Sequence, residues 1–515
     1  MDPLARIING AQSVGRQGIR KQFGRSLIAA RQSHLEFSWG ATIVSSDEFV
    51  KRYLRKLVAR SREATVNYEH LQKYHRTIQA NVVGPSGIQA IPKFVDDGPD
   101  KAPDKLANQA VKEAWEEWCE RGNCEVTGRL SFTGVQGVYM KTVPEDGEFL
   151  ARLVYDRSSR FGLRLQLLDT QLLPVDMNVA EHTNGNRIVM GIELNPWGRP
   201  VAYHIRQEKP TDTSWNHAGG HYERIPAEFI IHEFLTERVG QKRGLPWASS
   251  ALARIRMLYG LDEAVQTKTR IGASTTAVVT APEGKWKGAG EEDEDGWVNR
   301  EIIPGEYLVL PHGAELTKWD PESPKGELPL FRKAMIQTIA AGLVMSYPTI
   351  SGDLEGVNFS SIRHGAIEER RVYQCLREGL LIQGLVQRVY RAWLRAALLL
   401  EAITIPTKNG GSAPLSLERE RKYWNVRYQG AGWEYVRPLE DAAAWEKMVM
   451  TFQASPQEAI RARGGNPDVV LEEWGEFLGR MQELGIDYFG ANRGADNLLV
   501  AALLGGESEE KEPAR

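Results

Sequence analysis

The apolar positions in the first part of the chain follow a helical period. Between Asp47 and Val83 they recur every three or four residues, which predicts helix up to Gly84-Pro85. The segment "KLANQAVKEAWEEWCER" predicts another helix, because its alanines and tryptophans fall on one side and Gly122 follows as a stop.

Between Glu148 and Phe234 the apolar period changes to two, which is typical of strands. Five segments show it: "FLARLVYDR", "LRLQLLD", "RIVMGIEL", "RPVAYHIR" and "EFIIHEF". The turn "NPWG" lies between the third and fourth and predicts that they pair as a hairpin. Helices followed by an antiparallel or mixed sheet indicate an α+β fold.

Beyond Gly244-Leu245-Pro246 the helical period returns. Two amphipathic helices are predicted, "WASSALARIRMLYGLDEAVQTKTRIGAS", with Gly260 as a candidate bend, and "LPLFRKAMIQTIAAGLVMSYP", which Tyr347-Pro348 should end. The stretch between them is rich in glycine and proline and holds short β-like pieces at 277–280 and 306–310.

A polar loop leads from there into the longest predicted helix. The loop begins the segment "SGDLEGVNFSSIRHGAIEERR", and the proline-free stretch 361–402 that follows would be about 60 Å long as one unbroken helix. A charged helix of that length is usually shared by several packing layers or by neighbouring subunits. Two short helices with capping signals come later, "SPQEAIRARGG" and "NPDVVLEEWGEFLGRMQELG".

Composition narrows the class of protein. The 515 residues are 42% hydrophobic and 25% charged, with a net charge of −3 and three cysteines. This is typical of a soluble globular protein in a reducing compartment, without the overall basic field that holds nucleic acid tightly. No run approaches the roughly 18 to 20 uncharged apolar residues that cross a bilayer, so no membrane partner is expected. Residues 1–35 are predicted to be a basic arm and 506–515 a disordered tail.

Motifs for catalysis are weak. The chain has no phosphate-binding loop ("GKWKGAG" lacks the required Lys-Ser/Thr), no nucleophile elbow and no zinc-protease motif. His217 and His221 lie in the glycine-rich "HAGGH", where their spacing does not give a shared helix face for a metal.

The polar loop and the start of the next helix contain a possible nucleophile and two acids. They lack the further side chains that a catalytic triad or a magnesium site needs. Ser361 and His364 lack a third side chain to orient the imidazole, and helix capping by Asn358, Ser360 or Ser361 explains the serines better. Asp353 and Glu355 are two acids without further ligands for magnesium. The sequence therefore predicts no catalytic residue, no metal and no cofactor.

Four segments, in order, carry a family resemblance: "RSREATVNYEHLQKYHRTIQANVVGPSG", "GIELNPWGRPVAYHI", "IHEFLTERVGQKRGLPWASSAL" and "SGDLEGVNFSSIRHGAIEERR". Together with the order of the predicted elements, they resemble the lambda-type portal proteins of tailed bacteriophages. The local matches cover most of residues 15–490. "WEYVRPLED" departs from the family's usual Trp-x-Asp-Pro pattern at the start of the terminal helical domain.

The resemblance implies a structural protein that forms a ring, typically of twelve subunits, at one capsid vertex. Double-stranded DNA would pass through the ring during packaging, retention and ejection. Implied partners are the terminase large subunit, the major capsid and scaffold proteins, and head-completion or adaptor proteins. The protein would be assembled in the host bacterial cytoplasm and remain in the virion.

The resemblance also divides the chain into parts. These are an α+β wing (36–245), a first stem helix (247–275), a small β clip (276–327), a second stem helix (328–346), a tunnel loop (347–362), a long wing helix with following strands (363–435) and a helical crown (436–505).

The tunnel loop would face the DNA through Asp353, Glu355, Asn358, Ser360 and Ser361. A duct for a polyanion should bind it weakly, because each phosphate neutralised by Lys or Arg adds affinity and so friction. Acids repeated around a ring would repel phosphates, while short polar side chains make brief contacts.

The clip carries a run of acids, Glu291, Glu292, Asp293, Glu294 and Asp295. The run is either a solvated loop or a docking surface for basic partners. Two other functions stay open: a metal-dependent nuclease or other DNA-processing enzyme using Asp353, Glu355 and His364, and a helical scaffold that never meets DNA.

Overall fold

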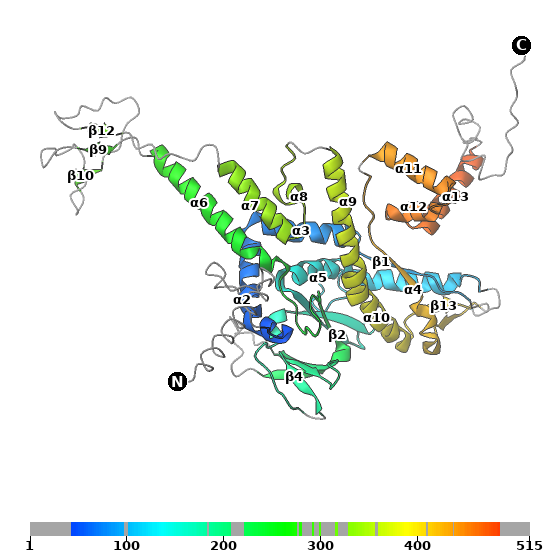
Figure 1. Cartoon of the computed structure of the whole chain (residues 1–515). Coiled ribbons are helices and arrows are strands. Elements are labelled where there is room, and N and C mark those ends of the chain that lie inside the picture. Colours follow the sequence, from blue (N-terminus) through cyan, green and yellow to red (C-terminus); the bar gives the residue numbers. More distant parts are fainter. Residues whose placement is uncertain are drawn as a thin grey trace, which may run out of the picture.

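The computed structural model describes residues 43–96, 101–182, 185–207, 221–274, 328–355, 359–407, 410–435 and 437–484, with four short strands between 278 and 317. The predicted basic arm and tail, "GKWKGAG" and the β-like piece at 306–310 lie outside these residues, as does His217. Figure 1 shows a central body from which one helix projects, with a group of short helices on the opposite side.

The first predicted helix is two helices, α2 (Ser46–Asn67) and α3 (Glu69–Val82). They are separated at Tyr68, whose backbone is extended and whose ring stacks on Tyr259 with centroids 4.3 Å apart. The stop at Gly84-Pro85 is confirmed: Gly84 has a φ of 76°, which favours glycine.

The second predicted helix is confirmed as α4 (Lys105–Cys119), which buries Trp115 and Trp118. The sequence pattern missed α5 (Phe132–Asp146), because two glycines and Pro144 argue against a helix. Packing outweighs those propensities, since Tyr139 and Met140 of α5 are fully buried in the main core.

Two antiparallel sheets follow. The first has the order β3-β2-β8, formed by β3 (Leu163–Leu168), β2 (Glu148–Tyr155) and β8 (Ile230–Phe234). The second has the order β4-β5-β6-β7, formed by β4 (Arg187–Val189), β5 (Ile192–Leu194), β6 (Pro200–Arg206) and β7 (Tyr222–Pro226). Helices packed with these sheets make the fold α+β, as predicted.

The prediction for "RIVMGIEL" was wrong in one respect: it is not one strand. Met190 and Gly191 adopt φ values of 50° and 81° and turn the chain, so β4 and β5 pair with each other as a hairpin. The hairpin at "NPWG" is confirmed, because β5 pairs with β6 and Gly198 N–H donates to the Asn195 carbonyl at 2.9 Å.

The projecting helix is α6 (Leu252–Ser274), and α7 (Leu328–Gly342) packs beside it. An ion pair of 3.0 Å joins Arg332 of α7 to Asp262 of α6. The strand pair of β9 (Val278–Thr280) with β12 (Glu315–Thr317) lies beyond the end of α6 (Figure 1). A second pair is β10 (Glu291–Glu292) with β11 (Val298–Asn299).

The predicted end of α7 at Tyr347-Pro348 was wrong. The helix ends at Gly342, and Pro348 instead opens a short helix, α8 (Tyr347–Ser351), where its missing N–H costs nothing. The long helix is confirmed: α9 (Phe359–Leu376), a π-helical segment (Arg377–Val386) and α10 (Gln387–Leu399) follow one another directly. The periodicity of the sequence did not predict the π-helical segment.

The last strands return to the body. β1 (Gln89–Pro92) pairs with β15 (Val426–Gln429), and β13 (Thr404–Pro406) pairs with β14 (Ser412–Pro414).

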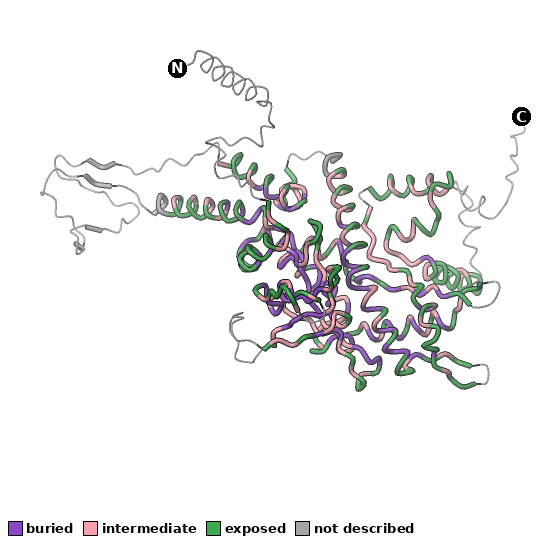
Figure 2. Tube along the Cα trace, turned by 60° about the horizontal axis from the view of Figure 1, so that its bottom comes forward, coloured by how far each residue is buried: buried purple, intermediate pink, exposed green. Residues whose placement is uncertain are grey.

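The last helices that the structure describes are α11 (Pro438–Met450), α12 (Pro456–Ala462) and α13 (Pro467–Glu483). Both predicted caps are confirmed, a capping box between Ser455 and Glu458 and a cap at Asn466. In the tube of Figure 2 these helices and most of α6 are exposed or half-buried, whereas buried segments fill the body.

A fully buried ion pair joins the body to the start of α6. Arg243, just before α6, donates through Nε to both carboxylate oxygens of Glu148 on β2, at 2.9 and 2.7 Å. Its Nη1 donates to the carbonyls of Leu173 and Met190 at 3.1 and 3.3 Å, and His232 Nε2 lies 3.0 Å from Glu148 Oε2. Burial acts to raise the pKa of Glu148, but Arg243 and His232 outweigh it and hold the pKa at about 2.

We expect Arg243→Met to lower the free energy of unfolding by about 3–5 kcal/mol, because it leaves the buried Glu148 carboxylate without its guanidinium partner. Urea denaturation measures the change. Arg371→Met is the control, since Arg371 pairs with Glu368 at an exposed position, and such pairs contribute about 0–1 kcal/mol. Equal losses in the two variants would contradict the role given to Arg243.

A buried histidine makes stability depend on pH. His75 of α3 is 2% exposed, and neither ring nitrogen has a hydrogen-bond partner among the described residues. Burial, with a smaller contribution from Lys141, lowers the pKa of His75 to about 4. The unfolded chain therefore takes up a proton as pH falls below about 6.5, while the folded chain does not until about pH 4.

We expect this histidine to remove about 2 kcal/mol of stability between pH 7 and pH 5. His75→Phe keeps a ring in the core and cannot titrate. Between pH 7 and pH 5, the free energy of unfolding of this variant should therefore fall by about 2 kcal/mol less than that of the wild type. Urea denaturation at the two pH values measures both proteins. An identical pH dependence in the variant would mean that His75 is not held neutral.

Candidate functional site

The polar loop predicted from the sequence follows α8, which α9 holds in place. The backbone N–H of Ser346 donates to Glu369 Oε1 of α9 at 2.7 Å, and Thr349 Oγ1 donates to Oε2 of the same carboxylate at 3.1 Å. Ile350 is buried in the main core. The start of the loop is therefore fixed to the body, although the helix that carries it is short.

Hydrogen bonds from Asp353 shape the described part of the loop. Its Oδ1 accepts the N–H of Glu355 and its Oδ2 accepts the hydroxyl of Tyr347, both at 2.9 Å. These two donors lower the pKa of Asp353, so the side chain is a carboxylate at neutral pH. Gly352 turns the chain with a φ of 76°.

The loop is exposed and shorter than predicted. Leu354 is 66% exposed, and Gly352 and Glu355 are exposed as well. Ser360 and Ser361 lie in the first turn of α9 instead of the loop, and Asn358 lies outside the described residues. The part of Ser351–Phe359 that the structure describes is therefore not sealed in a core.

Two lysines that the sequence reasoning missed lie beside the loop. The Lys333 Nζ of α7 lies 5.3 Å from the centroid of the Tyr347 ring, and Lys73 Nζ of α3 lies 3.2 Å from where a Cβ on Gly352 would stand. Both lysines are exposed. The loop acids are therefore next to positive charge, and the site is closer to neutral than its own sequence indicates.

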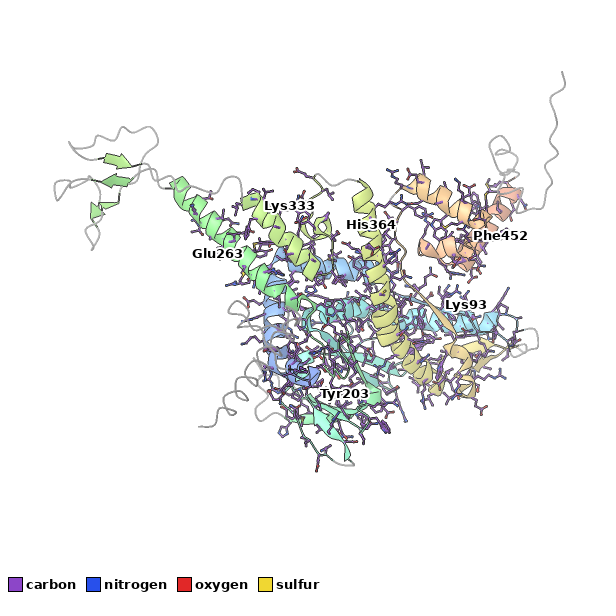
Figure 3. The ribbon with its side chains drawn as sticks, viewed as in Figure 1. Lys93, Tyr203, Glu263, Lys333, His364 and Phe452 are labelled. Carbon is purple, nitrogen blue, oxygen red and sulfur yellow. The ribbon has the colours of Figure 1, made fainter. Side chains whose placement is uncertain are left out.

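The residues of the alternative nuclease site do not come together. His364 is exposed on α9, and Figure 3 shows it along the same edge of the molecule as Lys333. Both oxygens of Asp353 already accept hydrogen bonds inside the loop. Within the described ranges, the grouping of three potential metal ligands contains none of Asp353, Glu355 and His364.

Arginines spaced seven residues apart connect the long helix to the C-terminal part of the chain. Arg363 Nη2 donates to Asp441 of α11 at 2.8 Å, and Arg370 Nη2 to the Glu434 carbonyl at 3.1 Å. Arg377 donates to the carbonyls of Asn81, Val82 and Ala431 and lies 4.7 Å from the Trp433 ring. Seven residues are about two helical turns, so the three arginines share one face.

The acidic run of the predicted clip is described only in part. Glu291 and Glu292 form β10 and pair with Asn299 and Val298 of β11. Asp293, Glu294 and Asp295 lie outside the described residues. A docking role for the run stays a prediction. No described helix is long and apolar enough to cross a membrane.

Comparisons with known proteins identify the family. Residues 32–377 match the model of the phage portal protein, lambda family. The chain is 30% identical over 485 residues to the probable portal protein of Halomonas phage phiHAP-1, covering 92% of this chain and 91% of the relative. It is 22% identical to portal protein B of Escherichia phage lambda, covering 67% of this chain and 68% of that protein.

A solved structure, the virion of a native gene transfer agent particle, aligns with a TM-score of 0.44 at 12% identity, covering 84% of this chain and 98% of that one. That likeness is too distant to add to the assignment. The sequence matches place the chain among the structural, non-enzymatic proteins of phage virions. The chain belongs to the lambda family of phage portal proteins, as the sequence resemblance predicted.

Proposed function

We propose that copies of this chain close into a ring, and that double-stranded DNA passes through its centre during packaging, retention and ejection. The observation that carries the proposal is the exposed polar loop after α8, fixed to the body by Glu369 and shaped by Asp353. Family membership supports the same role. Twelve subunits, the typical number in the family, is the number we propose.

Unburied apolar side chains support contact between copies. On α7 and α6, Phe331 is 56% exposed and Met257 66% exposed. On the last helices, Leu439, Leu471, Trp474 and Phe477 are exposed too, and Pro467 is the one buried residue that the described parts of α11, α12 and α13 contain. Large exposed apolar surfaces mark interaction sites, and a closed ring covers such surfaces on every subunit.

The charges around the loop suit a passage better than a binding site. Asp353 and Glu355 repel phosphates, while Lys73 and Lys333 offset part of that repulsion. A nearly balanced lining neither excludes the duplex nor holds it by releasing its counterions. In this proposal Asp353, Glu355, Asn358, Ser360 and Ser361 lie nearest the DNA.

The parts assigned from the family keep their roles in the proposal. The β strands beyond α6 would form the clip, where the acids Glu291 to Asp295 meet a basic surface of the terminase large subunit or of head-completion proteins. The helices α11 to α13 would form the crown inside the capsid.

We expect the purified protein to have the mass of a dodecamer, twelve times 57.7 kDa, by mass photometry. Phe331→Asp should shift the population to monomers, because it puts a charge into the proposed contact. Gln337→Asp adds the same charge at an exposed polar position of the same helix and is the control. A monomeric wild-type protein, or intact rings in Phe331→Asp, would refute the contact.

We expect Asp353→Lys to lower the yield of DNA-filled particles at least about tenfold, because a ring of lysines would hold the phosphates. Asp353→Met is the matched control, being similar in length and uncharged, and should package far better. Both variants should form rings of normal mass. Normal packaging with Asp353→Lys would mean that the loop does not approach the DNA, even if rings form.

A further inference from the structure

Three potential metal ligands meet on one face of the β4-β5-β6-β7 sheet. Glu193 lies on β5 and His204 on the neighbouring β6, where Glu193 pairs with Ala202, two residues before His204. Side chains two residues apart on a strand share a face, so the two lie diagonally across the strands. His182 comes from the segment before β4, and the three ligand atoms all lie within 4.8 Å of one another.

Two of the three side chains are buried, His182 is half-buried, and one buried ligand atom lacks a hydrogen bond within the described residues. Glu193 is 2% exposed and His204 8% exposed. His204 Nε2 has no hydrogen-bond partner among the described residues and lies 3.8 Å from Glu193 Oε2. The rings of His182 and His204 face each other edge-on, with centroids 6.2 Å apart. A buried nitrogen without a partner is unfavourable, so a ligand that used it would stabilise the fold.

We propose that His182, Glu193 and His204 bind one divalent transition-metal ion, with Zn²⁺ as the chemistry that fits best. Two imidazoles and a carboxylate are a known zinc ligand set, with bonds of about 2.0–2.2 Å and a fourth position for water. The bound ion fixes the segment before β4 to the face of the sheet. This role is structural and independent of the proposed DNA channel.

The present partners of Glu193 are compatible with a metal. Arg224 Nε donates to its Oε2 and Asn186 Nδ2 to its Oε1, each at 2.7 Å. A carboxylate has about four lone-pair directions, so one can go to a metal while both hydrogen bonds remain. Such bonds orient a ligating carboxylate. Ligand atoms of one zinc ion lie closer together than the 3.8 Å between His204 Nε2 and Glu193 Oε2, so binding has to draw these two side chains slightly together.

The test is a calorimetric titration of the chelator-treated full-length protein with Zn²⁺. We expect one ion per chain, and binding more than about 100-fold weaker in His182→Ala, since even second-shell changes cost about 10–100-fold. His221→Ala, an exposed histidine just before β7, is the matched control and should bind like the wild type. Co²⁺ should give the visible absorption of a tetrahedral site in the wild type and not in His182→Ala.

Melting temperature separates loss of the site from loss of the fold. Without metal, His182→Ala should have the same melting temperature as the wild type. Zn²⁺ should raise the melting temperature of the wild type and not that of His182→Ala. His204→Ala should behave likewise, and His182→Ala decides the result if His204→Ala does not fold. The proposal is overturned if the wild type binds no Zn²⁺, or if His182→Ala binds it as tightly, whatever the outcome for rings and DNA.

Discussion

The contact between Glu148 and Arg243 is the constraint on which the arrangement of this protein depends. It is fully buried, and it joins the central strand β2 to the segment that leads into α6. Next to it, backbone packs directly on backbone: a Cβ on Gly244 would stand 1.9 Å from the Gly147 carbonyl oxygen. Because neither glycine leaves room for a side chain, the direction in which α6 leaves the body is fixed.

The long helix formed by α9, the π-helical segment and α10 fixes other parts of the chain to the body. Its α10 part is held in the core by aromatic rings, with Trp393 and Trp115 centroids 4.9 Å apart. Its α9 part holds α8 through Glu369 and the C-terminal segment through Arg363 and Arg370, and Arg377 at the start of the π-helical segment adds a further bond. One helix therefore positions both the polar loop and helices α11 to α13. A change in the packing of this helix would move both of them.

The proposed function needs a rigid ring and a lining that does not bind DNA tightly. In this chain the rigid part is the body, where apolar burial and buried ion pairs are concentrated. The described part of the loop is exposed and is shaped by the two hydrogen bonds that Asp353 accepts. The apolar surface left on α7 and on the last helices is what other copies of the chain can cover.

The sequence by itself determined the features that depend on a few neighbouring residues. The caps at Ser455 and Asn466, the stop at Gly84 and the turn at "NPWG" all follow from local hydrogen bonds and backbone preferences. The periodicity of apolar residues predicted most of the helices and strands in their order. Four segments of the sequence indicated the family. In the candidate site, the sequence located the polar loop and its acids.

Only the tertiary structure decided the features that depend on residues far apart in the chain. Packing makes α5 a helix despite Pro144, and a turn at Met190 divides a strand that alternation alone made continuous. The lysines beside the loop come from α3 and α7, and His182, Glu193 and His204 meet because β5 and β6 pair. Local propensity acts over a few residues, whereas strand register and helix packing set distances across the whole fold.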